Sequence, residues 1–209
     1  MPSMVKAFIR AAAAALLLLL FCPLQAFADP QGELLGILDS TPAFSARFSQ
    51  TVHKSDGSTV SGSRGTIALR QTGEMLMHSE EPDEQILFAK GDLVCFYDPF
   101  VNQVTLFSSS QLQDSPFLLL TRSGRSNWNN YQVTKKGGEY VLRSKKRTTE
   151  VQELRLRFES GMVSRIALVM QDGSLNVYTL SSRRRSVDPG AFDFKIPEDA
   201  EIDDERGAK

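Results

Sequence analysis

Few side chains in this sequence could carry out covalent or metal chemistry. The two histidines, His53 and His78, have no histidine, cysteine or paired acidic partner at the spacing of a metal site. Cys95 lies in the apolar stretch "LVCFY", which favours a small buried side chain over a nucleophile. The sequence also contains no nucleophile elbow, phosphate-binding loop or dinucleotide fingerprint. We therefore expect no enzymatic activity, no metal site and no cofactor.

The first 28 residues have the features of a secretory signal peptide. Lys6 and Arg10 precede an uncharged apolar run at 11–21, and "AFA" at 26–28 is a small-x-small cleavage signal. We expect cleavage before Asp29, which leaves residues 29–209 as one exported domain. The apolar run is short for a membrane-spanning helix, and no later segment approaches spanning length.

Cys22 raises the separate question of lipid attachment within this leader. A lipidated cysteine needs small residues just before it, but Phe21 occupies that place and Pro23 follows. We therefore expect a mature protein that is cut after the leader and carries no lipid.

The mature chain carries a small negative charge. Of 24 Lys and Arg residues, Lys6 and Arg10 fall in the leader, which leaves 22 basic against 25 acidic residues, a net charge near −3. This balance argues against nucleic acid as a partner. Cys95 is the only cysteine after the leader, so no internal disulfide can form and the apolar core alone must stabilise the fold.

Turn signals divide the mature chain into many short segments. Leu34, Leu35 and Leu38 first form a helical stripe, which Pro42 ends. From Phe44 onward apolar residues alternate with polar ones, and turns rich in Gly, Asp and Pro separate about ten or eleven such segments, the last in "AFDFKIP". We expect most of these segments to be β-strands.

A second helix is expected in the middle of the chain. Asp114 or Ser115 is a candidate N-cap, Pro116 takes the first helical position, and Gly124 is a candidate end. So many sequential strands in one domain predict a mainly β, up-and-down antiparallel sheet with short helices. A barrel of that strand number is too wide for its own side chains to fill, so it flattens or encloses a cavity.

The three strands expected between Gln85 and Phe107 are apolar on both faces, in the stretch "QILFAKGDLVCFYDPFVNQVTLF". An ordinary half-buried sheet alternates apolar with polar residues. We therefore expect one face of these strands to line a hydrophobic cavity and the other to lie under the helices.

Several short motifs in this region resemble the LolA family of periplasmic lipoprotein carriers. Pro82 and Asp83 precede an apolar strand, Gly91 and Asp92 form a turn, and "FYDP" is followed by "QVT" at 103–105. The agreement extends along the mature chain through "FSARFSQTV", "SPFLLLTR", "NWNNYQV", "QDGSLNVYTL" and "FDFKIPEDAEIDD". The order and spacing of the motifs carry the resemblance, since no single motif is specific.

The resemblance implies an incomplete antiparallel β-barrel, a half-barrel, closed by a helical lid and enclosing a hydrophobic cavity. Such carriers shield the acyl chains of lipoproteins in the periplasm and hydrolyse nothing. They accept acylated lipoproteins from an ATP-driven transporter in the inner membrane and deliver them to a receptor lipoprotein at the outer membrane. We expect the same of this protein, as a monomer without a membrane span.

The resemblance also implies roles for individual residues. The family's arginine, whose hydrogen bonds to lid-helix carbonyls hold the closed form, corresponds to Arg70, although the proline that follows it is Gln71 here. An aromatic pair of the family corresponds to Met75 and Met77. The residues expected to contact acyl chains are Leu35, Leu38, Met75, Met77, Phe117, Leu119 and Leu120.

A second function is open on the same fold. A periplasmic regulatory domain could use the half-barrel to sense lipids or mislocalised lipoproteins. Such a sensor is expected to carry an additional domain, which a carrier does not need.

Overall fold

The structure, a computed structural model, describes residues 29–112, 115–122, 128–146 and 150–207. Twelve strands of this part of the chain form one sheet. Their spatial order is β12 (Glu201–Asp204), β6 (Gln103–Ser108), β5 (Leu93–Asp98), β4 (Gln85–Lys90), β3 (Glu74–Glu81), β2 (Thr59–Arg70), β1 (Ala43–His53), β11 (Leu175–Arg184), β10 (Met162–Met170), β9 (Val151–Glu159), β8 (Glu139–Ser144) and β7 (Tyr131–Lys136). The expected signal peptide, residues 1–28, lies outside the described residues.

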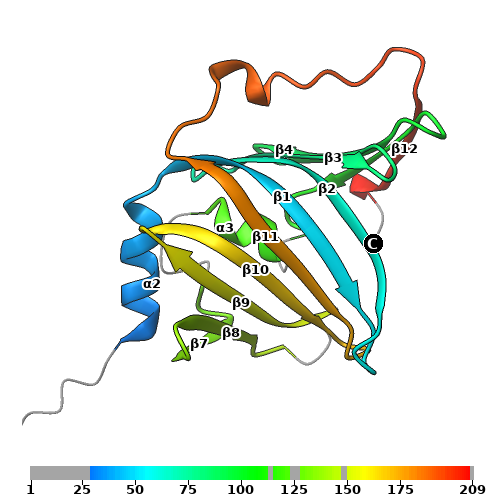
Figure 1. Ribbon diagram of the computed structural model, residues 1–209. Helices are drawn as coiled ribbons and strands as arrows, with labels where there is room; N and C mark the ends of the chain where they lie inside the picture. Colours follow the sequence, from blue (N-terminus) through cyan, green and yellow to red (C-terminus); the bar gives the residue numbers. More distant parts are fainter. Residues whose placement is uncertain (1–28, 113–114, 123–127, 147–149, 208–209) are drawn as a thin grey trace, which may run out of the picture.

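The sheet is open, because β12 and β7 lie at its two edges and do not pair with each other. Neighbouring strands are antiparallel except β12 and β6, which are parallel. The described helices are α2 (Pro30–Asp39), α3 (Pro116–Leu120) and the 3-10 helices η2 (Pro189–Phe192) and η3 (Glu205–Gly207). The fold is thus mainly β, as the sequence predicts, and Figure 1 shows the sheet curving around α3.

Helix α2 forms where the leucine stripe predicts it. Its N-cap Asp29 accepts a hydrogen bond from Gly32 N at 2.9 Å, and a proline occupies the first helical position. Leu34, Leu35 and Leu38 are its buried side chains. Helix α3 begins after Ser115, as expected, but it has only five residues; the other candidate termini, at 114 and 124, lie outside the described residues.

The close pairing of β2 with β3 depends on a glycine. A Cβ atom on Gly65 would lie 1.9 Å from the carbonyl oxygen of His78, a distance that no side chain tolerates. The strands meet beside an irregularity in register between Arg64 and Gly65. From there to Arg70 they pair continuously, which brings Ile67 opposite Met77 and Leu69 opposite Met75.

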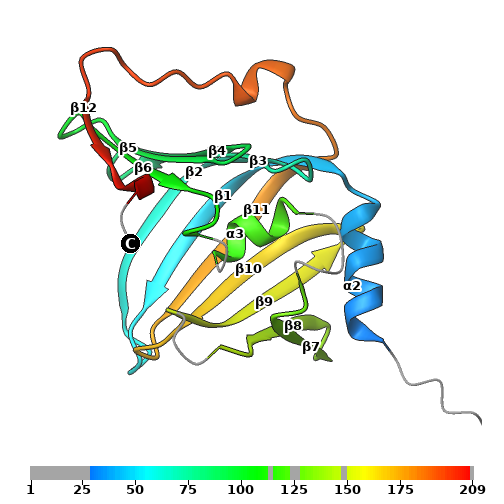
Figure 2. The ribbon, with the colours of Figure 1, turned by 180° about the vertical axis from the view of Figure 1, so that it is seen from behind.

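The side chains of the sheet divide between two apolar clusters. The larger cluster joins α2 and α3 to the sheet face that we call the inner face; it includes Leu69, Met75, Ala89 and Val94. Figure 2 shows α3 lying over this face and α2 at its margin. Strand residues point to alternate sides, so the neighbouring positions on β2 to β6 belong to the opposite, outer face. These outer residues include Ala68, Phe88, Cys95, Val104 and Leu106.

The outer face is covered by chain, but not by the helices that the sequence led us to expect. The segment between β11 and β12, which we call the C-terminal arm (residues 185–200), crosses it. The side chains of the arm that belong to the outer cluster or pack against it are Val187, Ala191, Phe192, Phe194, Ile196 and Ala200. Figure 1 shows this arm in orange and red above β3 and β4. The helices could not do this, because their buried leucines all belong to the inner cluster.

The strand predicted in "AFDFKIP" is therefore wrong. Phe192 ends the 3-10 helix η2, and the next eight residues, 193–200, belong to no strand. After this helix, Phe194 and Ile196 both pack against the outer cluster at a spacing of two residues, as in a strand, although residues 193–200 belong to no strand. The last strand is instead β12, whose four residues are all exposed.

Candidate functional site

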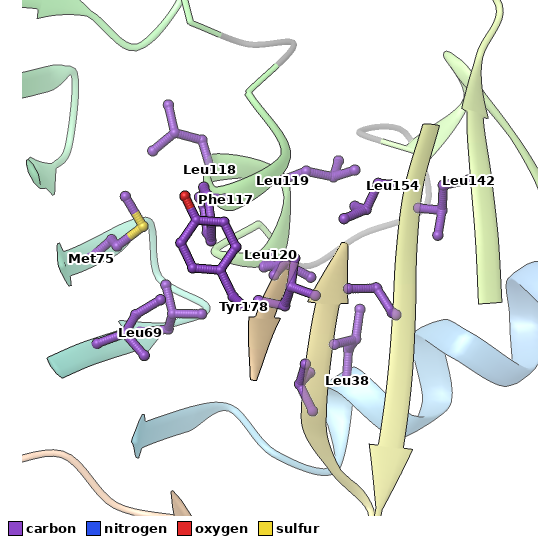
Figure 3. Packing of buried hydrophobic residues seen from close by; sticks show 14 of the residues in the cluster. Leu38, Leu69, Met75, Phe117, Leu118, Leu119, Leu120, Leu142, Leu154 and Tyr178 are labelled. Carbon is purple, nitrogen blue, oxygen red and sulfur yellow. The ribbon is translucent and has the colours of Figure 1, made fainter. Parts of the chain in front are cut away.

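The inner cluster contains the residues that the sequence singled out for acyl-chain contact. Six of the seven are buried members of this cluster, namely Leu35, Leu38, Met75, Phe117, Leu119 and Leu120, and Met77 packs against it partly buried. Figure 3 shows part of this cluster, with Leu118 and Leu120 of α3 on the side of Tyr178 and Leu119 on the side of Leu154. The structure thus brings the seven residues together, while acyl-chain contact itself stays a prediction.

A hollow of about 330 Å³ opens beside this cluster between β1, β2, β3, β4, β5, β11 and α3. Of the seven predicted residues, Met77 and Phe117 line it. The ring of Tyr178 packs edge-on against Phe117, with centroids 5.1 Å apart, and against Phe48 at 5.8 Å. Burial raises the pKa of Tyr178 to about 12, so its hydroxyl stays neutral and adds no charge to this wall.

Four apolar residues of the hollow escaped the sequence reasoning. They are Phe48, Leu87, Phe96 and Tyr178, all from strands. The alternation in their strands was visible, and it could have assigned each to the same face as its neighbours two positions away. What it could not give is which of the two faces holds the hollow.

A second, much smaller space lies between α2 and the sheet. It has a volume of only about 20 Å³ and includes Leu38 and Leu120 in its lining. Interiors of proteins are close-packed, and a gap of this size marks an ordinary helix-to-sheet contact. Leu35, Met75 and Leu119 line neither space.

The turn between β2 and β3 links the ends of both helices to the sheet. Gln71 donates from its side-chain Nε2 to the carbonyl oxygen of Leu38, near the end of α2, at 2.6 Å. The backbone N–H of Gly73 donates to the carbonyl oxygen of Thr121, directly after α3, at 3.1 Å. Gly73 has a φ of 91°, a backbone conformation that favours glycine. One short turn therefore holds two helix ends.

Arg70, the residue expected to close the lid, lies on the other side of the sheet. Its guanidinium donates to the Glu74 carboxylate at 2.7 Å and lies 4.7 Å from the ring centroid of Phe192, in the C-terminal arm. Burial opposes ionisation of Glu74, but hydrogen bonds from Arg70 and Thr72 outweigh it and lower the pKa of this carboxyl group. The lid-closing role of Arg70 stays a prediction.

His53, His78 and Cys95, the side chains with most potential for metal or covalent chemistry, do not line the hollow. His78 Nε2 lies 2.7 Å from Glu84 Oε1 in a partly exposed pair. Cys95 is fully buried in the outer cluster, and burial raises the pKa of its thiol to about 11. In the part of the chain that the structure describes, no group of three His, Cys, Asp or Glu residues could hold a metal ion.

Comparison with known proteins agrees with this architecture. The profile of the family described as outer membrane lipoprotein carrier protein LolA matches residues 39–195. The outer-membrane lipoprotein carrier protein of Actinobacillus pleuropneumoniae serotype 7 (strain AP76) is 34% identical over 189 residues, which cover 88% of this chain and 89% of that protein. The protein of the same name from Vibrio cholerae serotype O1 (strain ATCC 39315 / El Tor Inaba N16961) is 32% identical, over 91% of this chain and 98% of its own.

A solved structure shares the fold at low sequence identity. The crystal structure of an uncharacterized conserved protein from Thermus thermophilus superposes with a TM-score of 0.52 and 11% identity, covering 83% of this chain and 98% of that one. Fold and site together define a class of mainly β proteins in which an open curved sheet holds short helices against its inner face. Within that class, the chain belongs to the LolA family of outer-membrane lipoprotein carrier proteins.

Proposed function

We propose that this protein is a periplasmic carrier that binds the acyl chains of lipoproteins on its inner face and hands the lipoproteins to the outer membrane. Membership of the carrier family supports the cargo and the route. The observation that carries the binding site is the hollow lined by Met77, Leu87, Phe96 and Phe117. Binding of this kind needs no covalent step, which agrees with the placement of Cys95 away from the hollow.

The size of the hollow indicates that loading requires the helices to move. At about 330 Å³ it is at the lower end of the range for ligand sites, roughly 300–1,000 Å³. A larger space of about 520 Å³ shares Phe48, Gln50, Ser63 and Pro82 with it, but charged side chains such as Arg47, Arg64 and Glu81 also line that space. The long acyl chains of a lipoprotein need more apolar room than the hollow offers. We propose that α3 and the end of α2 act as the lid and swing away from the sheet, so that the chains replace leucine side chains on the inner face.

The contacts that loading breaks explain how a carrier can also release its cargo. Burying an acyl chain contributes about 0.8 kcal/mol per CH₂, so a site that captured cargo at no cost would hold it too tightly. In our proposal, opening breaks the bonds from Gln71 to Leu38 and from Gly73 to Thr121, each worth about 0.5–1.5 kcal/mol. The loaded form is then strained, and delivery relieves the strain.

The expected partners follow from this cycle. An ATP-driven transporter of the inner membrane would supply lipoprotein, and a receptor lipoprotein of the outer membrane would accept it. The described residues include no helix with the length and apolar content to cross a membrane.

The decisive experiment measures release and delivery separately. Spheroplasts with labelled lipoproteins are incubated with and without the purified mature protein, and lipoprotein in the supernatant is quantified. We expect release only with the protein, and transfer of the released lipoprotein to the purified receptor. A protein that binds lipoprotein but never delivers it would instead be a sensor, and the carrier function would be wrong.

A further inference from the structure

One corner of the molecule exposes apolar side chains that the fold does not use. Among the described residues, four large apolar side chains are exposed, and three of them gather at the turn between β5 and β6 and on the neighbouring β12. Phe100 is 92% exposed, Val101 56% and Ile202 48%. Figure 2 shows β12 beside β6 at this edge of the sheet. We call these three residues the apolar tip.

The turn that presents the apolar tip is held by several hydrogen bonds. Phe100 N donates to the Asp98 carboxylate at 3.0 Å, and Asn102 N donates to the carbonyl of Pro99 at 3.3 Å. The Asn102 side chain accepts from the Tyr97 hydroxyl at 3.1 Å and donates to the carbonyl of Asp199 at 3.0 Å. A phenyl ring on so braced a turn loses little backbone freedom when it binds, which favours its use as an anchor.

The surroundings of the apolar tip are strongly acidic. The residues from Pro197 to Asp204 include five carboxylates, Glu198, Asp199, Glu201, Asp203 and Asp204, of which Asp204 is paired with Arg206. All five are exposed, and Asp98 adds another carboxylate at the turn itself. The negative surface potential of anionic lipids would repel this corner. A protein surface that combines an apolar pocket with a rim of Lys and Arg is complementary to it.

The apolar tip lies at the same end of the sheet as residues that line the hollow. Strands β3 to β6 are antiparallel neighbours, so the β3–β4 turn and the β5–β6 turn lie at the same end of the sheet. Pro82, Asp83 and Gln85, around the β3–β4 turn, line the hollow, as does Phe96 near the end of β5. A partner seated on the tip is therefore next to the opening of the binding site.

We propose that the apolar tip is a docking anchor for a protein partner that offers an apolar pocket ringed by basic residues, and that it aligns this partner with the hollow. The tip supplies the aromatic anchor, and the acidic residues around it supply orientation and attraction at a distance. This proposal rests on the proposed carrier function only in the choice of partners to be tested.

The test compares Phe100→Ser/Val101→Ser with the wild-type protein in three binding measurements. The probes are the soluble domain of the outer-membrane receptor, the inner-membrane transporter in nanodiscs, and vesicles of phosphatidylethanolamine and phosphatidylglycerol. We expect about a tenfold or larger loss of affinity for at least one of the two proteins. Wild-type affinity for that protein should fall with added salt, and Glu201→Lys/Asp203→Lys should weaken it further. Val60→Ser is the matched control, since Val60 is 54% exposed but lies on β2.

Three outcomes would overturn the proposal: wild-type binding to neither protein, equal binding by variant and wild type, or a loss that affects the vesicles instead. Uptake of labelled lipoprotein by the purified variant, presented in detergent, is measured in parallel. We expect normal uptake, because the apolar tip lines no part of the hollow. A failure of uptake by the wild-type protein would count against the carrier function, separately from the docking site.

Discussion

The two faces of strands β3 to β6 have nearly the same apolar character, but different parts of the chain cover them. On the outer face, Phe192 is 2% exposed, and Phe194 packs against Phe88 with ring centroids 5.5 Å apart. On the inner face, Met77 and Phe96 border a hollow of about 330 Å³. Over these residues the outer face lies under the chain's own C-terminal arm, whereas the inner face borders the hollow. Nearer β1 and β2 the outer face also keeps a space of about 280 Å³, whose lining includes Ala68, Leu76 and Ala191.

The covers of the two faces differ in a way that explains this. The C-terminal arm is irregular and can place each side chain where the sheet needs it. The inner cover is made of two helices, whose rigid stripes of leucine pack well at one end of the face and leave space at the other. The difference teaches that an apolar sequence alone does not tell which face of these strands borders the hollow.

The largest expected effect is on the outer face. Phe192→Ala should lower the free energy of unfolding by about 3–5 kcal/mol, because it removes a buried ring and leaves a cavity. Urea denaturation measures this, and the folded variant should still bind lipoprotein with unchanged affinity. Phe100→Ala is the control and should change stability by less than about 0.5 kcal/mol, since Phe100 is exposed. Loss of cargo binding by the folded Phe192→Ala variant would contradict the assignment of stability to the outer face and binding to the inner face.

The inner face should show the reverse pattern. Met77→Glu places a charge where desolvated acyl chains would lie, so lipoprotein affinity should fall about tenfold or more. Its cost in stability should be smaller than that of Phe192→Ala, because Met77 is only partly buried. Met77→Leu conserves volume and should change neither quantity much. If Met77→Glu lowered stability while its folded fraction bound lipoprotein with wild-type affinity, Met77 would have only a packing role.

A smaller effect is expected at the turn between β2 and β3, which contacts the ends of both helices. Gln71→Glu keeps the shape of the side chain but loses the N–H that bonds Leu38, which should favour opening by about 1 kcal/mol. Trp128, the only tryptophan in the sequence, is fully buried in the inner cluster and reports the change. The indole ring should become more accessible, so acrylamide should quench its fluorescence more strongly. Arg70→Leu should have less effect, because the contacts of Arg70 are with Glu74 and Phe192. If Arg70→Leu increased the quenching more than Gln71→Glu, Arg70 and not Gln71 would be the residue that holds the closed form.

The smallest effect is expected at the outer-face thiol. With a pKa raised to about 11 and no exposed surface, Cys95 should react slowly with thiol reagents at neutral pH. Because the thiolate is the reactive form, the rate should rise with pH up to that pKa. Denatured protein, whose thiol has an ordinary pKa, is the control and should react quickly. Cys95→Ser should still carry lipoprotein; loss of delivery by a folded Cys95→Ser variant would contradict a purely structural role.

Local pattern was enough to predict most of the elements. The leucine stripe of α2, the alternation from Phe44 and the turns at the glycines all correspond to short-range preferences that the sheet does not override. The pattern failed at "AFDFKIP", because an extended arm and a strand have the same side-chain period. It also missed β12, whose "EIDD" has no buried residue to mark it.

The candidate site illustrates the same limit. Ile67, Ala68, Leu69 and Arg70 alternate along β2, which assigns Arg70 to the side of Ala68 and away from the helices. The expected role of Arg70 was based on the family resemblance alone, without this alternation. The hydrogen bond from Gln71 was not predicted, because nothing in the sequence tells where the carbonyl of Leu38, 33 residues earlier, will lie.

By itself, the sequence determined that the chain folds into a long series of antiparallel strands with two helical stretches and an excess of apolar residues in the middle strands. These properties depend on side-chain period, turn residues and composition, which act over a few neighbouring positions. Only the tertiary structure decided which face of those strands lies under the C-terminal arm and which borders the hollow. That choice depends on how a distant arm and two helices fit the curvature of the sheet, and fit is a property of the assembled shape.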